Sequence, residues 1–156
     1  MGILDIASGN SIWRGYNYYE EKKVLSFEKI NDTLFKGVVS GNSNEPYNVT
    51  LDIAHPKKST CTCPHAEGTR RICKHKIALY FTIFPDEAER LINEARAYKE
   101  EEEQRQIQTQ KDLVSYVHKL RKSQAQELLL ELLLTGPELQ YDNFVRAHLD
   151  DDYYHY

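Results

Sequence analysis

Residues 59–84 read STCTCPHAEGTRRICKHKIALYFTIF and contain all three cysteines of the chain. Cys61 and Cys63 are separated by one residue, and after nine further residues Cys73 and His75 repeat that spacing. Thiolates and an imidazole are the ligands that give zinc a closed tetrahedral site. The stretch therefore predicts one bound Zn2+ held by three cysteines and a histidine.

The spacing also constrains the backbone around the metal. Side chains i and i+2 of a strand share a face, so Cys61 and Cys63 can reach one ion from an extended segment. In mid-helix the same spacing would place Cys73 and His75 about 200° apart. They converge only if Cys73 lies at or before a helix start and His75 lies in its first turn. The free N–H groups at that helix end also favour thiolate over thiol.

A second histidine, His65, follows Cys63 closely and is a rival fourth ligand on spacing alone. The C-x-C…C-x-H order resembles the SWIM zinc finger, a module of transposases, chromatin remodellers, recombination-mediator complexes and small stand-alone prokaryotic proteins. The resemblance extends over residues 10–84, including RGYNYY at 14–19, and implies His75 as the ligand. It also implies a DNA-binding or protein-binding module.

The segments before the cysteines predict a small sheet. Residues 24–30 and 34–39 are β-type runs around an Asn-Asp turn, and residues 47–53 alternate apolar with polar side chains. Residues 73–84 have helical apolar spacing and end before Pro85. The predicted fold class is α+β, with a small antiparallel β-meander packed on a zinc-anchored helix.

Aromatic residues are concentrated ahead of the sheet, in residues 8–21. Trp13, Tyr16 and Tyr19 fall on one face of a short helix, which Ser8 or Asn10 could cap. We expect these rings to pack in the core, and a base-stacking surface is the alternative. Gly15 is expected to be a mild helix penalty.

The remainder of the chain predicts helices, and we divide it as residues 1–85 for the zinc-binding domain, 86–150 for a helical extension and 151–156 for a tail. Residues 99–111 contain one large apolar residue, Ile107, and could be a solvated helix or a polar break. Residues 128–134 read LLLELLL. Such a run belongs to the centre of a helical bundle or to an interface with a protein partner or a second copy, through residues 113–149.

The charge distribution restricts how the chain could bind nucleic acid. The net charge of −4 argues against nonspecific coating of DNA. Around the cysteines, however, the only acid between residues 55 and 76 is Glu67. The basic residues there are Lys57, Lys58, Arg70, Arg71, Lys74 and Lys76. They could contact phosphates, for which Arg70, Arg71, Lys74 and Lys76 are the candidates, or offset the negative charge of a zinc–thiolate centre.

The function predicted from these features is recognition without catalysis. Four available ligands leave zinc no open position for water, so we expect a structural site and no enzymatic activity. Three cysteines cannot pair completely, which favours a reducing compartment, and no membrane span or secretion signal is recognisable. We expect a cytoplasmic or nuclear protein that binds DNA, or else a protein-interaction adaptor that uses its leucine-rich C-terminal helices.

Overall fold

The computed structural model describes residues 2–41 and 45–149. The chain divides into two units, residues 1–97 and 98–156, which are described separately below. An antiparallel sheet and several helices make the fold α+β, with a C-terminal helical part, as predicted. The predicted domain boundary after residue 85 stays a prediction, since the division into units falls inside a helix. The predicted tail, residues 151–156, lies outside the described residues.

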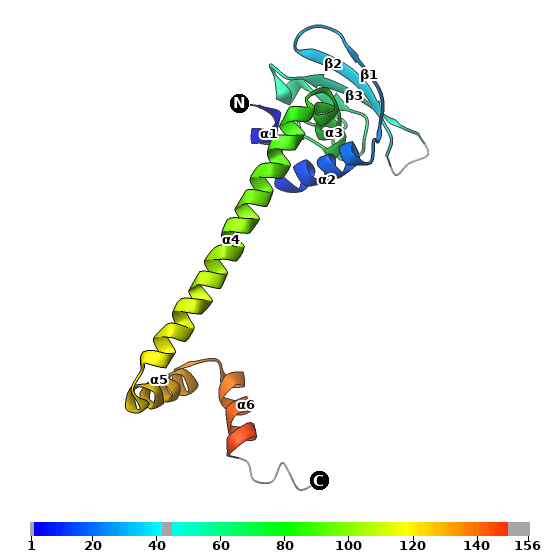
Figure 1. The fold of residues 1–156 in the computed structure, drawn as a ribbon. Helices are drawn as coiled ribbons and strands as arrows, with labels where there is room; N and C mark the ends of the chain where they lie inside the picture. The colour runs from blue at the N-terminus through cyan, green and yellow to red at the C-terminus, as the bar shows by residue number, and fades with distance from the viewer. Residues whose placement is uncertain (1, 42–44, 150–156) are drawn as a thin grey trace. The chain divides into compact units, whose positions relative to one another are not determined.

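The sheet of the first unit is an antiparallel meander, as the sequence predicts (Figure 1). Its strands, paired in chain order, are β1 (Val24–Lys29), β2 (Leu34–Val39), β3 (Tyr47–Asp52) and β4 (Thr60–Cys61). The short β4 contains Cys61 of the extended segment that the sequence predicts for Cys61 and Cys63, and it ends at Cys61, before Cys63. It matters for the site, since its pairing sets Cys61 opposite Val49 of β3.

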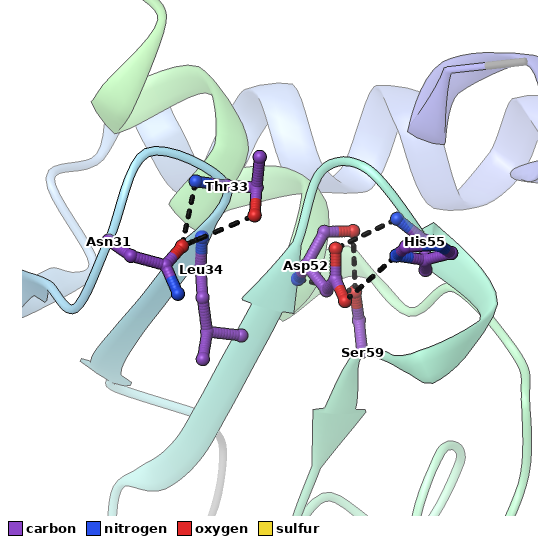
Figure 2. Close-up of polar contacts among 6 residues, drawn as sticks. All are labelled: Asn31, Thr33, Leu34, Asp52, His55 and Ser59. Carbon is purple, nitrogen blue, oxygen red and sulfur yellow. Dashed lines mark hydrogen bonds and ion pairs between the residues drawn. The ribbon is translucent and has the colours of Figure 1, made fainter.

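Two polar side chains fix the connections at one end of the sheet (Figure 2). The side-chain oxygen of Asn31 accepts hydrogen bonds from the backbone N–H groups of Thr33 (2.9 Å) and Leu34 (2.8 Å), which closes the β1–β2 turn. Asp52 accepts from the backbone N–H of His55 at 2.8 Å. The backbone N–H of Asp52 donates to Ser59 Oγ at 3.0 Å, which joins the end of β3 to the segment that enters β4.

Helix α3 (Lys74–Ile83) lies between the sheet and helix α2 (Gly9–Glu20) (Figure 1). A Cβ on Gly37 of β2 would lie 2.7 Å from Leu79, and one on Gly15 of α2 would lie 2.4 Å from Ile77. Both glycines therefore permit close packing, and Gly15 is a packing requirement more than a helix penalty. Because α3 is covered on two sides, its apolar residues are not confined to the single stripe that the sequence suggests.

The core of this unit consists of residues from the sheet, the cysteine segment and α3. Ser8 caps α2 by accepting from the N–H of Ser11 at 3.2 Å. Tyr16 and Tyr19 are half-buried against Phe81, with ring centroids 6.1 and 6.2 Å away. The expectation for Trp13 was wrong, since it is 42% exposed. The short helices α1 (Ile3–Ile6) and η1 (Pro56–Lys58) complete the unit before α4 (Pro85–Lys119), whose Ala88 is buried.

The second unit contains the end of α4 together with α5 (Lys122–Thr135) and α6 (Glu138–His148). Residues 99–111 are helical throughout, so the polar segment does not break α4. Gln124 caps α5 by accepting from the N–H of Arg121 at 3.0 Å, and α5 ends before Gly136-Pro137. Helices α5 and α6 contact each other. None of the described residues from 98 to 149 is buried.

Candidate metal centre

Three backbone segments bring the predicted ligands together. Cys61 ends β4, and Cys63 lies two residues further on, at the bend that precedes a turn; both cysteines are buried while Thr62 between them is exposed. Thr62 fixes this segment to β3, because its hydroxyl accepts from the N–H of Asn48 at 3.0 Å and its own N–H donates to Asn48 O at 3.1 Å. The chain then turns through Gly68, whose φ of +65° favours glycine.

The second pair of ligands lies at the start of α3. Cys73 is the N-cap residue of the helix, in extended conformation with φ −93° and ψ 166°, and His75 lies in the first turn. The carbonyl of Cys73 accepts the first helical hydrogen bonds, from the N–H groups of Lys76 and Ile77 at 3.1 and 3.2 Å. This is the placement that the C-x-H spacing requires.

The four side chains form a group whose ligand atoms all lie within 4.8 Å of one another. Each is at most 3% exposed. Cys61 Sγ lies 3.7 Å from His75 Nδ1. Zn–S and Zn–N bonds of roughly 2.3 and 2.0–2.1 Å at a tetrahedral angle put sulfur and nitrogen roughly 3.6 Å apart. The donor set and its dimensions therefore fit a tetrahedral metal ion, and closed sites of three cysteines and a histidine typically bind zinc.

His65, the alternative fourth ligand suggested by spacing, is exposed and does not belong to the group of four ligands. His75 instead is enclosed by two aromatic rings, with the centroid of Tyr47 4.6 Å and that of Tyr18 5.5 Å from its own. These rings hold the imidazole so that Nδ1 faces Cys61. Its Nε2 is buried, with no hydrogen-bond partner among the described residues. Tyr47 could have been anticipated, since it shares the inward face of its strand with Val49.

Electrostatic interactions favour thiolate at the helix end. A hydrogen bond from Cys61 lowers the pKa of Cys73 to about 3, against the opposing effect of burial, and His75 and the backbone N–H of Lys76 lower it further. The hydrogen bond with Cys73 is also the main reason that the pKa of Cys61 is raised. Burial raises the pKa of Cys63. Cys73 is therefore the first thiolate available to a metal ion.

Lys76 is buried, although the basic residues near it in the sequence suggest an exposed position. It is fully buried, at 0% exposure. Its ammonium donates to the carbonyl oxygens of Ser59 at 2.7 Å and Arg71 at 2.8 Å, which ties the start of β4 to the segment before α3. Burial lowers its pKa, and the nearby Cys73, Cys61 and Cys63 oppose that shift. The prediction that Lys76 contacts nucleic acid does not fit this burial.

The other predicted nucleic-acid contacts differ in exposure. Arg70 and Arg71 are exposed on the segment before α3. Lys74 is half-buried, and its ammonium donates to Tyr18 Oη at 2.5 Å and lies 4.1 Å from the centre of that ring. Arg14 of α2 lines the same surface hollow as Lys74 and was missed, because it lies far from the cysteines in the sequence.

Comparisons with known proteins bear on the region that contains the metal centre. Residues 47–84 match the family model described as SWIM zinc finger. No curated protein and no solved structure matches the chain. The match begins with β3 and ends with α3, so it includes both ligand pairs and the two elements that position them. Residues 47–84 of this chain thus match the SWIM zinc finger, and Cys61, Cys63, Cys73 and His75 form a possible metal-binding group within the matched region.

Proposed function

We propose that the zinc finger binds nucleic acid, with DNA as the first candidate, through basic side chains beside the metal centre. Residues 47–84 contain six Lys or Arg against two Asp or Glu, although the whole chain has a net charge of −4. Binding of phosphate by Lys and Arg releases counterions and supplies most nonspecific affinity for nucleic acid. A local cationic face on an acidic chain would confine that binding to the finger.

The observation that carries the proposal is a group of exposed cations without acidic partners. Lys57, Lys58 and Arg70 line one surface cavity of about 380 Å³ together with His55. Arg71 follows Arg70 and is also exposed. None of these lysines and arginines forms an ion pair with a described residue. Their charges are therefore available to an anionic partner.

A structural role for the zinc supports recognition over catalysis. Three thiolates and one imidazole complete a tetrahedral shell, so a water molecule would have no position on the metal. The four ligands join β4 to α3, and Lys76 joins the same two segments a short distance away. The metal would thus hold in place the segment that bears Arg70 and Arg71.

Titration of the zinc-loaded protein with short duplex and single-stranded DNA over a range of salt concentrations tests the proposal. Each phosphate contact contributes about 0.9 to the slope of log affinity against log salt on duplex DNA, so Arg70→Ala/Arg71→Ala should lower that slope by up to about 2. Lys36→Ala/Lys111→Ala, which removes two exposed cations outside residues 47–84 that likewise form no ion pair with a described residue, is the matched control. Equal affinity and slope for the wild type and the Arg70/Arg71 variant would exclude this binding face.

Protein interaction through the C-terminal helices is a second candidate role, and the exposed leucines of α5 favour it. Leu129, Leu130, Leu132 and Leu134 are between 45% and 72% exposed. A large apolar patch on a protein surface generally marks an interaction site. The described residues include no helix that is both long enough and apolar enough to span a membrane. We consider another protein chain as the partner that covers these leucines.

A further inference from the structure

The helices of the second unit lack a core of their own. Of the seventeen exposed large hydrophobic residues that the structure describes, thirteen lie between residues 98 and 149, and none of the described residues in that range is buried. Ordering a helix costs conformational entropy, which proteins offset mainly by packing an apolar face. Helices α5 and α6 therefore need a surface to pack against that they do not supply to each other.

The exposed leucines lie on two sides of α5. Leu129 and Leu132 are three residues apart and share one side, whereas Leu130 and Leu134 are four apart and share another. All four are exposed, although α6 contacts α5. The α5–α6 pair thus retains apolar surface that a further helix pair could cover.

Along α5 and α6, the basic side chains are concentrated at the start of α5 and the acidic side chains follow them. Lys119, Arg121 and Lys122 lie around the start of α5, and no further Lys or Arg follows until Arg146. The acidic residues between them are Glu127, Glu131, Glu138 and Asp142. None of these charged side chains has an ion-pair partner among the described residues. Cations at a helix N-terminus are also unfavourable to the helix dipole, as is an acid near the C-terminus.

We propose that residues 113–149 bind a second copy of this chain, with α5 of one copy antiparallel to α5 of the other. An antiparallel pair sets the basic start of each α5 beside the acidic end of its partner and opposes the two helix dipoles. Residues 113–149 contain four Lys or Arg and four Asp or Glu. A segment with a basic end, an acidic end and no net charge is complementary to a second copy of itself in the opposite direction. A partner of strongly acidic or strongly basic character would be attracted to only one of the two ends.

The apolar area is sufficient for such a contact. Residues 113–149 include eleven exposed large hydrophobic residues. Together their side chains offer apolar area on the order of the 800 Å² per partner that a standard protein interface buries. The inference rests on the protein-interaction role proposed for these helices and is independent of nucleic-acid binding. It would place two zinc fingers in one particle.

Light scattering after size exclusion, with the zinc-loaded full chain from about 1 to about 100 µM, tests self-association directly. We expect a dimer that Leu130→Glu/Leu134→Glu weakens by about a hundredfold or more, since it buries two carboxylates in the contact. Both leucines are exposed within one chain, so the variant should keep its zinc and its helical content. Gln104→Glu/Gln110→Glu adds the same charge at exposed polar positions of α4 outside residues 113–149 and should remain a dimer.

Charge exchange tests the antiparallel direction. Lys119→Glu/Arg121→Glu/Lys122→Glu should weaken the dimer about tenfold or more at low salt, since it replaces several attractions with repulsions. Adding Glu127→Lys/Glu131→Lys/Glu138→Lys to the same chain should restore the dimer, because the two ends again have opposite charge. A parallel pair sets like charges beside like in the wild type and in both variants, so it should respond much less to either change; a lack of weakening or of rescue overturns the antiparallel arrangement.

A wild-type chain that is monomeric throughout the concentration range overturns self-association. Binding of an apolar dye then separates the two ideas that meet at these helices. A monomer that binds the dye, and loses that binding in Leu130→Glu/Leu134→Glu, contradicts a second copy as partner but keeps an apolar face for another protein. A monomer that binds no dye contradicts both.

Discussion

Gly15 of α2 faces Ile77 of α3 so closely that a Cβ on residue 15 would lie 2.4 Å from Ile77 Cβ and 3.0 Å from the carbonyl oxygen of Lys74. The second contact is with backbone in the turn of α3 that holds His75. Packing between α2 and α3 therefore affects the metal centre. If α3 shifted to make room for a methyl group on residue 15, the ligand His75 would move with it.

Gly15→Ala should therefore destabilise the first unit by about 1–3 kcal/mol, the usual cost of overpacking, although alanine is the better helix former. Denaturant unfolding of the zinc-loaded protein measures the change. Gly9→Ala is the matched control in the same helix, where an added Cβ meets nothing within 4 Å. It should be neutral or slightly stabilising, and an equal loss of stability in both variants would contradict a steric cause.

Lys76→Met should lower the stability by about 1–3 kcal/mol, because it keeps the length of the side chain but leaves one buried and one part-buried carbonyl oxygen without this donor. Those acceptors are Ser59 O and Arg71 O, at 2.7 and 2.8 Å from the ammonium. The measurement is thermal unfolding with zinc bound. Lys58→Met removes an exposed lysine from the same basic region and should have little effect; comparable losses would mean that burial of the ammonium is unimportant.

The sequence predicts much of the metal centre because its chemistry depends on local spacing. A C-x-C pair suits extended backbone and a C-x-H pair suits a helix start, and the structure has Cys73 as the N-cap of α3 with His75 in its first turn. The strands followed from alternation, and the end of α3 from Pro85. Each of these inferences needs only residues close together in the chain.

What the sequence did not predict depends on contacts between distant residues. In the sequence, Lys76 is one of several basic residues near the ligands and is expected on the surface. Only the structure shows that its ammonium lies inside the fold, where the carbonyl oxygens of Ser59 and Arg71 accept from it. Gly15 reads as a weak point of a helix until α3 is seen against it. Trp13 has the spacing of a core residue, but α2 covers α3 with its other residues and leaves the indole 42% exposed.

One equivalent of zinc should bind per chain, and its removal by a strong chelator should unfold at least residues 59–84. Structural zinc can contribute on the order of 10 kcal/mol to folding, which is comparable to the whole stability of a small domain. Circular dichroism measures the loss of helix, and hydrogen exchange locates it. An unchanged helix signal after complete removal of zinc would contradict a structural role.

His75→Ala should lose zinc affinity by at least about a hundredfold, whereas His65→Ala should retain it, since only His75 lies with the three thiols. The comparison is matched, because both variants remove an imidazole from the same finger. Competition against a chelator of known affinity gives the two constants. Equal loss in both would mean that the fourth ligand is not unique.

The apparent zinc affinity should fall as the pH is lowered. A hydrogen bond with Cys73 raises the pKa of Cys61, and burial raises that of Cys63, so both are thiols at neutral pH in the metal-free chain. The pKa of Cys73 is lowered to about 3, so it has no proton to release. Binding must then expel about two protons, and each pH unit lost should cost up to about a hundredfold in affinity.

Calorimetry of zinc binding in buffers of different ionisation enthalpy counts the protons released, and competition titrations from about pH 6 to about pH 8 give the slope. The chelator alone, titrated with zinc at each pH, is the necessary control, since its own affinity also depends on protons. Release of about two protons agrees with thiols at Cys61 and Cys63. Release of none would mean that these sulfurs are already thiolates before the metal arrives.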